Sequence, residues 1–516
     1  MTIAEKSQKV TSPRWLHFWL ACLPATLFAA LVALLGLFSL HNLPRWTFPL
    51  LGFYALTQLL PAIVTPEPVL ALGGAFLRTA LMFGLLGLGA AMGQTRRLWP
   101  LALGLIIVYL TALGFNVVEG LDVFVSRLTH PYMTPITLGL AGALGIWLAL
   151  FSKGHLAWRV PLGLLGGTIL LLSGSRGPLL AVLIGSLAAF VLRRRQQALA
   201  VLLLTGLLAG ASVTVGERLG INLLTRLTQT DTSGRDVVWS NTLSVIRAHP
   251  LTGVGSYRLG ARLTPPGEPC AIFDTYQSQD KPPTCPPWLA RLGNPWLIAH
   301  NIALQQLAET GPLGLLGLMV LLTAVTVVTL MGRDPFAVAV VTGLLVATVN
   351  DNTLLVPSPF FAEVFWLVAG TQLAAVRHPS FGWKEGLLGV GLSLMLCAPL
   401  WVARVLPSTE KSPIAARLSY FNAPATAKSK EPYSVYVQFS VPDGKYRAVL
   451  KSCPNACVTL KTVEFYARSG QSDLMNMTSK VGTSGTRNLV LQLLPGKATF
   501  RFPVIAQKTW TVQVQP

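Results

Sequence analysis

Three residues of types that could carry out a reaction stand in short polar segments of the chain: Arg176, Arg235 and His300. Arginine is permanently charged, and its planar fork of N–H donors can grip phosphate oxygens bidentately. Histidine has an ordinary pKa of about 6.5, so a neutral imidazole can accept a proton from an alcohol. Together these residue types indicate chemistry in which an anionic group is held while a hydroxyl is deprotonated.

The order of the motifs around these residues is more specific than any motif alone. In chain order they are Leu172-Ser-Gly-Ser-Arg-Gly-Pro178, Gly234-Arg-Asp-Val-Val-Trp-Ser-Asn-Thr-Leu-Ser-Val-Ile-Arg-Ala-His-Pro-Leu-Thr-Gly-Val-Gly255 and Ala299-His-Asn-Ile-Ala-Leu-Gln-Gln-Leu-Ala-Glu-Thr-Gly311. This combination resembles the signature of the O-antigen ligase superfamily, which includes lipopolysaccharide O-antigen ligases, protein O-oligosaccharyltransferases and O-antigen polymerases. The resemblance covers about residues 70–370. Thr129-His-Pro-Tyr132 is similar to an earlier external turn of the family, with Tyr132 where the family has Asn.

The resemblance implies an enzyme that moves a glycan from a polyprenyl (undecaprenyl) diphosphate carrier to an acceptor hydroxyl. Arg176 and Arg235 match functional arginines of the family and are expected to stabilise the charge that grows on the leaving diphosphate. His300 is the expected general base. Direct displacement at the anomeric carbon predicts inversion. The resemblance implies no metal and no other cofactor.

His300 precedes a stretch whose apolar residues follow helical spacing, so it is expected at a helix N-terminus, where the helix dipole disfavours an imidazolium. Glu309, on the same helix, could orient the base or an arginine. Glu309 and the neighbouring Asn301 are assigned to substrate binding. The polar residues 350–352 end an apolar run, and a helix cap explains them equally well, so they are not assigned to catalysis.

Three further arginines are weaker candidates for substrate binding. Arg78 falls inside an apolar run, where a charge costs about 3 kcal/mol unless it finds a polar partner. It could contact the phosphates of the carrier or pair with Glu363. Arg247 and Arg258 could extend the group of arginines that holds the diphosphate, although a loop salt bridge or a lipid headgroup contact explains each of them as well.

The composition requires a membrane around these motifs. Of the 516 residues, 52% are hydrophobic and only 12% are charged, against roughly 25% charged in soluble proteins. Apolar runs long enough to cross a bilayer follow one another from Trp15 to Arg404. The net charge of +20 is explained by basic loops that stay on the cytoplasmic side, rather than by nucleic acid. We therefore predict an all-α polytopic membrane protein that contacts the lipid bilayer.

About twelve transmembrane helices are predicted. They are expected at residues 15–40, 46–63, 69–93, 98–116, 133–151, 157–173, 177–192, 198–215, 312–331, 335–350, 360–376 and 385–404. With the basic loops inside, the long loop 216–311, between spans 8 and 9, lies outside the cytoplasm together with Arg176. The active site is thus expected on the extracytoplasmic face of the bacterial inner membrane. The orientation of the N-terminus stays open, because Lys6 and Lys9 favour the inside, while the alternation puts them outside.

The C-terminal part of the chain has a different character. After residues 1–14 and the transmembrane core 15–404, we predict a linker at 405–430 and an extracytoplasmic β-sandwich at 431–516, in which apolar and polar residues alternate. Two cysteines of the external loop 216–311 and two of this domain suggest the disulfides Cys270–Cys285 and Cys453–Cys457, with metal binding or redox chemistry as the alternative. No catalytic constellation occurs in the β-domain, so binding or spacing is its expected role.

The acceptor stays open at this stage: a glycolipid such as lipid A-core, a growing polysaccharide or a protein. Two hypotheses from other classes stay open as well. A lipid-linked glycan transporter would share the basic external surface without making a bond. A membrane-anchored binding protein would have its active part in the tail.

Overall fold

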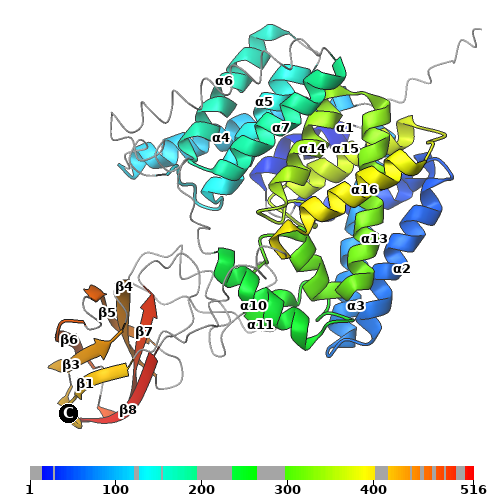
Figure 1. The fold of residues 1–516 in the computed structure, drawn as a ribbon. Coiled ribbons are helices and arrows are strands. Elements are labelled where there is room, and N and C mark those ends of the chain that lie inside the picture. Colours follow the sequence, from blue (N-terminus) through cyan, green and yellow to red (C-terminus); the bar gives the residue numbers. More distant parts are fainter. Residues whose placement is uncertain are drawn as a thin grey trace, which may run out of the picture. The chain divides into compact units, whose positions relative to one another are not determined.

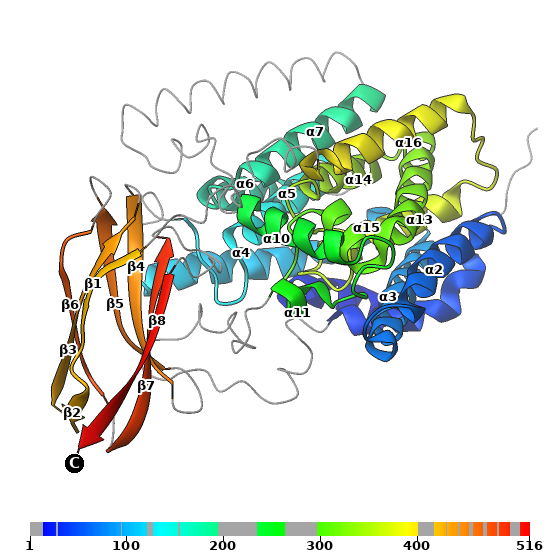
Figure 2. The same ribbon diagram turned by 60° about the horizontal axis from the view of Figure 1, so that its bottom comes forward.

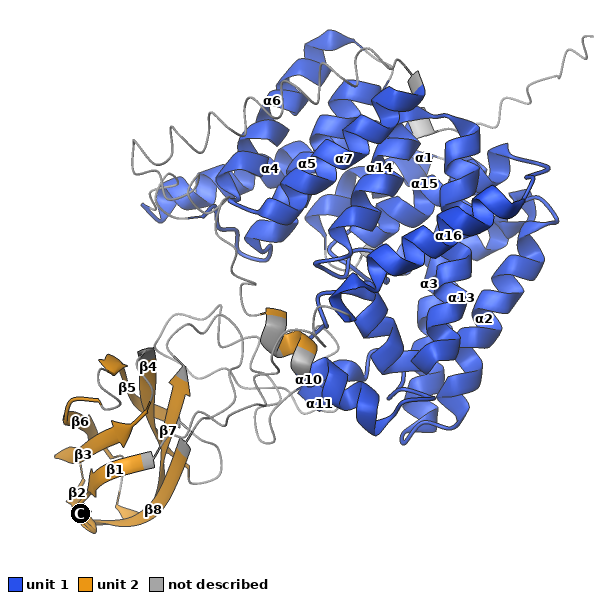
Figure 3. Ribbon diagram, viewed as in Figure 1, with its two compact units in different colours: residues 1–230, 241–263, 292–401 blue, residues 231–240, 264–291, 402–516 orange. Residues whose placement is uncertain are grey.

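The computed structural model forms two compact units (Figure 3), which comprise residues 1–230, 241–263 and 292–401, and residues 231–240, 264–291 and 402–516. The described residues are 14–26, 29–93, 95–120, 127–152, 155–193, 235–263, 297–400, 417–429, 431–441, 444–453, 458–467, 472–481, 484–495 and 506–515. In these residues the first unit is helical, and the second contains both β-sheets.

Most of the described chain is helical (Figure 1). The helices are α1 (Arg14–Cys22), η1 (Leu23–Ala25), η2 (Ala29–Asn42), α2 (Thr47–Ile63), α3 (Pro68–Met92), η3 (Thr95–Leu98), α4 (Leu101–Val118), α5 (Pro135–Phe151), α6 (Leu156–Leu172), α7 (Arg176–Arg193), α10 (Arg235–Ala248), α11 (Leu259–Leu263), α13 (Ile302–Gly332), α14 (Pro335–Ala347), α15 (Phe361–Ala375) and α16 (Trp383–Leu396). Three of them, α3, α4 and α13, are long and apolar enough to cross a membrane. The rest of the predicted twelve-span arrangement stays a prediction.

Helices occupy nearly all the predicted spans that fall within the described residues. The exception is the first predicted span, 15–40, which the structure divides into α1, η1 and η2. Pro24 lies at the start of η1, where the lack of a backbone N–H prevents an α-helix from continuing through it. The predicted span 198–215 lies outside the described residues.

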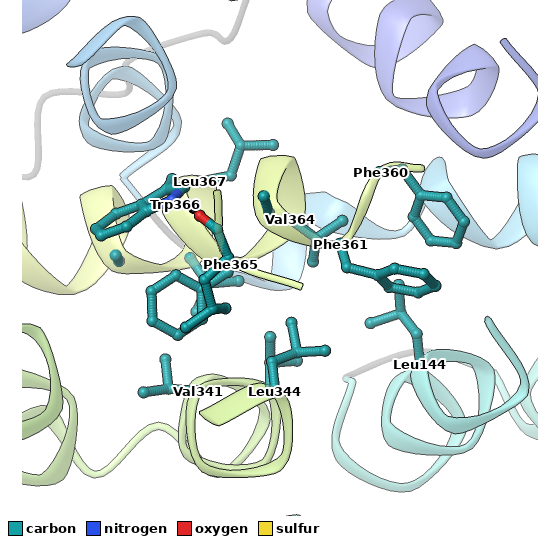
Figure 4. Close-up of a cluster of buried hydrophobic side chains, with 14 of the residues drawn as sticks. Leu144, Val341, Leu344, Phe360, Phe361, Val364, Phe365, Trp366 and Leu367 are labelled. Carbon is teal, nitrogen blue, oxygen red and sulfur yellow. Dashed lines mark hydrogen bonds between the residues drawn. The ribbon is translucent and has the colours of Figure 1, made fainter. Parts of the chain in front are cut away.

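Helix α15 lies at the centre of the apolar core of the first unit. All of its residues from Phe361 to Leu373 are buried, and they pack against side chains of α5 and α14 such as Leu144 and Val341 (Figure 4). A helix that is apolar on every side is expected to be enclosed by other helices. Gly89 of α3 lies so close to α15 that a Cβ there would come within 2.1 Å of the Leu367 carbonyl oxygen. Small residues thus let α3 and α15 approach closely.

The helices of the first unit define two ends, which matter for function. Helices α7 and α14 lie side by side in Figures 1 and 2. They run antiparallel, because Gly185 contacts Ala339, whereas Ala181, nearer the start of α7, contacts Gly343, nearer the end of α14. The start of α7 and the end of α14 therefore share one end, which we call the motif end. The opposite end holds the turn from α13 to α14 and the end of α7, and we call it the basic end because the predicted basic loops lie there.

The sheets of the second unit share one buried apolar cluster, the arrangement that a β-sandwich requires. The strands are β1 (Arg417–Asn422), β2 (Thr426–Lys428), β3 (Pro432–Ser440), β4 (Gly444–Ser452), β5 (Val458–Ala467), β6 (Met475–Lys480), β7 (Gly485–Pro495) and β8 (Ala506–Gln515). Their orders are β1-β3-β6 and β2-β8-β7-β4-β5. Phe439 of β3 stacks on Phe465 of β5, from the other sheet, with ring centroids 6.0 Å apart.

The sheets begin earlier in the chain than expected. Strands β1 and β2 fall within the residues predicted as a linker, where β1 pairs with β3 and β2 with β8. Their short polar sequences carry little alternation, so tertiary pairing decides their structure. Cys453 is disulfide-bonded, as predicted, whereas its predicted partner Cys457, and also Cys270 and Cys285, lie outside the described residues.

Candidate functional site

His300 stands in an unusual backbone position immediately before α13. Its φ of 51° is in the left-handed region, which few residues other than glycine adopt. Its Nδ1 lies 3.1 Å from Oδ1 of Asp351, and the two side chains are 34% and 20% exposed. Because an ionised carboxylate can only accept, this contact requires the proton on Nδ1. The lone pair of a neutral imidazole is then on Nε2, the nitrogen required to act as a base.

Asn301 holds this arrangement in place. Its Oδ1 accepts from the backbone N–H of Leu304 at 2.8 Å and so caps the N-terminus of α13. Its Nδ2 donates to the carbonyls of Val349 at 2.9 Å and Leu396 at 3.1 Å. The side chain is fully buried. These contacts favour a positioning role for Asn301 over the predicted contact with substrate, and they bring His300 beside Asp351.

Asp351 is the functional candidate that the sequence reasoning did not select. It lies just past α14, and its Oδ1 also accepts from the backbone N–H of Asn352 at 2.8 Å. A run of polar residues at the end of an apolar helix is as typical of a helix cap as of a catalytic site. The partnership with His300 depends on the pairing of two segments about fifty residues apart, which no local pattern encodes.

Helix α13 breaks soon after it begins, and the break explains the glycine motif at 249–255. Gly311 has a φ of 65°, and Pro312 lacks the N–H that would bond to the carbonyl of Ala308. The backbone N–H of Val254 donates to that carbonyl at 2.9 Å, and the N–H of Gly255 donates to the carbonyl of Glu309 at 2.8 Å. The motif thus replaces the hydrogen bonds that the helix loses at its break.

A buried ion pair lies beside the break and connects it to α3. Nη2 of Arg78 lies 2.6 Å from Oε2 of Glu309, and the two side chains are only 2% and 1% exposed. The alternative that Arg78 pairs with Glu363 is wrong, because the Glu363 carboxylate instead accepts from the backbone N–H and the hydroxyl of Ser358, at 3.0 and 2.7 Å. The alternative that Glu309 orients an arginine agrees with this contact.

The second oxygen of Glu309 extends the network toward His300. Oε1 accepts from the backbone N–H of Tyr257 at 2.9 Å and from Nε2 of Gln305 at 2.7 Å. Gln305 in turn accepts from the backbone N–H of Ala299 at 2.7 Å. Three side chains therefore join α3 to the residue that precedes the base.

Tyr257 covers the other side of the ion pair. Its ring centroid lies 4.3 Å from the guanidinium carbon of Arg78, within the range of a cation–π contact. Burial raises the pKa of Tyr257 to about 12, although the positive charge of Arg78 opposes the shift. The hydroxyl therefore stays protonated at neutral pH and donates to the carbonyl of Val356. No described residue accepts from Nε or Nη1 of Arg78.

Arg176 begins α7, so it lies at the motif end, like Asp351. Arg127, another residue that the sequence reasoning did not select, supports the turn before it. Nε of Arg127 donates to the carbonyl of Ser173 at 2.9 Å, and Nη2 donates to the Ser175 hydroxyl at 2.6 Å. The only signal in the sequence was a basic residue three positions before the His130-Pro turn.

The other candidate arginines are more dispersed. Arg235 is the first residue of α10 and belongs to the second unit, so its proximity to His300 stays a prediction. Arg247 is exposed in the last turn of α10. Arg258 pairs with Glu67, which precedes α3, so the salt-bridge alternative describes its contact. Direct binding of substrate by Arg247 or Arg258 stays a prediction.

Comparison with known families matches residues 161–319 to the O-antigen ligase family. The match covers α6, α7, α10, α11 and the start of α13, and therefore includes Arg176, Arg235 and His300. Comparison with curated proteins found no match. The matched region thus contains both predicted arginines and the predicted base, and it supports the resemblance to the O-antigen ligase superfamily.

Proposed function

We propose that this protein transfers a glycan from a polyprenyl diphosphate carrier to an acceptor hydroxyl, with His300 as the general base. The observation that carries the proposal is the contact between His300 and Asp351 at the motif end, within hydrogen-bond distance and open to solvent. A general base needs a free lone pair and a path to the acceptor. Nε2 of His300 has the free lone pair.

In the proposed reaction, Nε2 of His300 removes the proton of the acceptor hydroxyl as its oxygen attacks the anomeric carbon. The bond from that carbon to the carrier breaks, and its electron pair stays on the departing diphosphate oxygen. Attack from the face opposite the carrier inverts the anomeric centre. The carboxylate of Asp351 stabilises the imidazolium that forms and holds the ring in the required tautomer.

Arg176 and Arg235 are proposed to hold the diphosphate. Negative charge grows on the leaving group during the reaction, so fixed guanidinium groups stabilise the transition state more than the bound donor. Arg247 and Arg258 are proposed to extend this basic surface. The reaction then requires no metal to neutralise the diphosphate.

Arg78, Glu309 and Asn301 are proposed to act on the reaction mainly through position. Each is buried and bonded within the protein, and together they fix both sides of the turn that carries His300. Arg78 is also proposed to contact the carrier through Nε and Nη1, from which no described residue accepts a hydrogen bond.

The acceptor class is not specified by these residues, since lipid, polysaccharide and protein acceptors all present a hydroxyl. We propose that the site works on the extracytoplasmic face of the inner membrane, because the basic loops lie at the opposite end of the helices. The C-terminal β-domain is proposed to bind or space the acceptor.

The test is transfer by the full-length protein in vesicles that contain a polyprenyl diphosphate-linked glycan and host membrane acceptors. Free carrier diphosphate and the mass of the glycan-bearing product are measured. His300→Ala and Asp351→Asn are expected to lower the transfer rate by about 10²–10⁴-fold. His155→Gln, which changes an exposed histidine at the basic end, is the matched control and is expected to keep the wild-type rate.

Transfer by His300→Ala at the wild-type rate would refute the role of the base. Movement of the lipid-linked glycan across the bilayer, with no product from any variant, would favour the transporter. The product mass assigns the acceptor class.

A further inference from the structure

A cavity of about 910 Å³ opens at the basic end of the first unit, away from His300. It is lined by the ends of several helices and by the turn from α13 to α14. Its size falls in the range of about 300–1,000 Å³ that is typical of small-molecule sites. None of the residues discussed for glycan transfer lines it.

The lining of the cavity has an apolar part and a cationic part. Phe151, Leu192 and Phe336 contribute apolar surface, and Arg159 and Arg333 contribute positive charge. Trp99 also lines it and is 58% exposed. Exposed tryptophans of membrane proteins gather at the level of the lipid headgroups, because the ring is apolar and its N–H is polar. The composition therefore suits a molecule with both an anionic group and hydrocarbon.

The acidic residue of the cavity is already engaged. Oδ1 of Asp334 accepts from the backbone N–H groups of Phe336 and Ala337, at 3.0 and 3.2 Å, and so caps α14. Arg159 is partly engaged, since it donates to the carbonyls of Ala149 at 2.7 Å and Leu150 at 3.0 Å. The guanidinium of Arg333 is exposed, and its backbone has a φ of 52° after the last residue of α13.

The backbone of Arg333 argues for a role of its side chain. Glycine or asparagine is the favoured residue where a helix ends in the left-handed region, because other side chains are strained there. Arginine at this position therefore incurs a conformational cost that a simple helix end does not require. A ligand bound by the guanidinium of Arg333 would explain why arginine is present despite this conformational cost.

We propose that this cavity binds the phosphate of an anionic phospholipid, with Arg333 as the main contact and with acyl chain lying on the apolar lining. Basic pockets between membrane helices on the cytoplasmic side recognise anionic headgroups in this way. Arginine binds a phosphate by charge and by paired hydrogen bonds. The site is separate from glycan transfer and does not depend on the proposed function.

The test compares binding of phosphatidylglycerol and phosphatidylcholine of the same acyl chains to the full-length protein in nonionic detergent, by native mass spectrometry and by titration. Salt is kept at about 0.15 M, where distant charges are screened beyond about 8 Å. The wild type is expected to prefer phosphatidylglycerol. Inorganic phosphate and glycerol phosphate are added separately, to distinguish a lipid headgroup from a free phosphate.

Arg333→Asn is the central variant, because asparagine tolerates the left-handed backbone and removes only the guanidinium. A cation near a headgroup contributes about 1 kcal/mol, so the affinity for phosphatidylglycerol should fall about fivefold. Arg333→Lys should retain most of it. Lys384→Gln removes an exposed charge outside the cavity lining and should leave the affinity unchanged.

Unchanged phosphatidylglycerol affinity in Arg333→Asn would overturn the proposal. An equal loss in Lys384→Gln would overturn it too, since it would indicate diffuse surface charge. Displacement of the lipid by inorganic phosphate at comparable concentration would assign a free anion instead of a lipid. Because lipid binding is measured without transfer, none of these results bears on His300.

Discussion

Replacing Glu309 by glutamine would test whether the buried ion pair with Arg78 holds the site together. The carboxylate accepts hydrogen bonds from Tyr257 and Gln305 and forms the ion pair with Arg78. Glutamine keeps one acceptor oxygen, and its NH₂ group must face either the guanidinium of Arg78 or the N–H donors of Tyr257 and Gln305. A buried cation is then left without its counter-charge.

Breaking a buried pair in this way costs about 3–5 kcal/mol. Glu309→Gln is therefore expected to lower the free energy of unfolding by that amount, as measured by denaturant titration in mixed micelles. The double variant Arg78→Met with Glu309→Gln removes both charges and is expected to recover about 1–4 kcal/mol relative to the single variant. Transfer should stay low in the double variant, because it lacks the ion pair that joins α3 to the His300 turn.

A loss below about 1 kcal/mol in Glu309→Gln would refute this reasoning, since an exposed pair contributes no more than that. Equal stability of the single and double variants would show that the charges are not coupled. Full transfer by the double variant would show that the pair supports the fold without positioning the base.

Three further predictions concern the break in α13, a buried histidine and the donor chemistry. Gly311→Ala should destabilise the protein by at least about 1 kcal/mol, because the new Cβ would come within 2.0 Å of the Leu251 carbonyl oxygen at a φ of 65°; Gly167→Ala, where the space is open, is the matched control in the same denaturant titration. Burial lowers the pKa of His130 below its usual value, so its neutral form stabilises the fold above pH of about 6.5 and this contribution is lost as pH falls through the lowered pKa; unfolding titrations from pH 7 to 5 should show a smaller loss in His130→Asn than in the wild type. A strong chelator should leave the rate of product formation unchanged, because guanidinium groups supply the charge for the leaving group; inhibition that Mg²⁺ or Mn²⁺ reverses would contradict this.

The helices were largely predictable, because membrane spans require long apolar runs whose limits are visible in the sequence. Helices α2 to α7, α14 and α15 lie close to the ranges predicted for them, whereas α16 ends at Leu396, before the predicted end at residue 404. The break into α1, η1 and η2 was not predicted, although Pro24 could have suggested it. Hydropathy measures how apolar a segment is and carries little information about where its backbone departs from an α-helix.

The motif residues were predictable by type, whereas their partners were not. His300 was selected from its motif, but Asp351 became a candidate only when the capping bonds of Asn301 brought α13 beside the end of α14. Burying the charge of Arg78 is costly, so a partner was expected. Glu309 and Glu363 were both available as acidic partners. The contact of Glu309 with Arg78 decides between them.

The C-terminal domain shows the same division. Strands with clear alternation, such as β3 and β8, lie within the β-domain predicted at 431–516. β1 and β2 are short and are defined by the strands beside them, so their sequences resemble a linker. Strands β3 and β4 follow one another in the chain but lie in different sheets, although so short a connection would suggest a hairpin.

The break in α13 also separates two tasks of one helix. Residues 312–332 form a shaft of about 30 Å at 1.5 Å per residue, enough to match a bilayer, while residues 302–310 are tied to the 253–257 loop and to α3. His300 therefore takes its position from this loop, from α3 and from the ends of α14 and α16 that Asn301 contacts, and not from the shaft. We therefore expect a change in the tilt of the shaft to alter the position of His300 less than a change in the 253–257 loop or in α3.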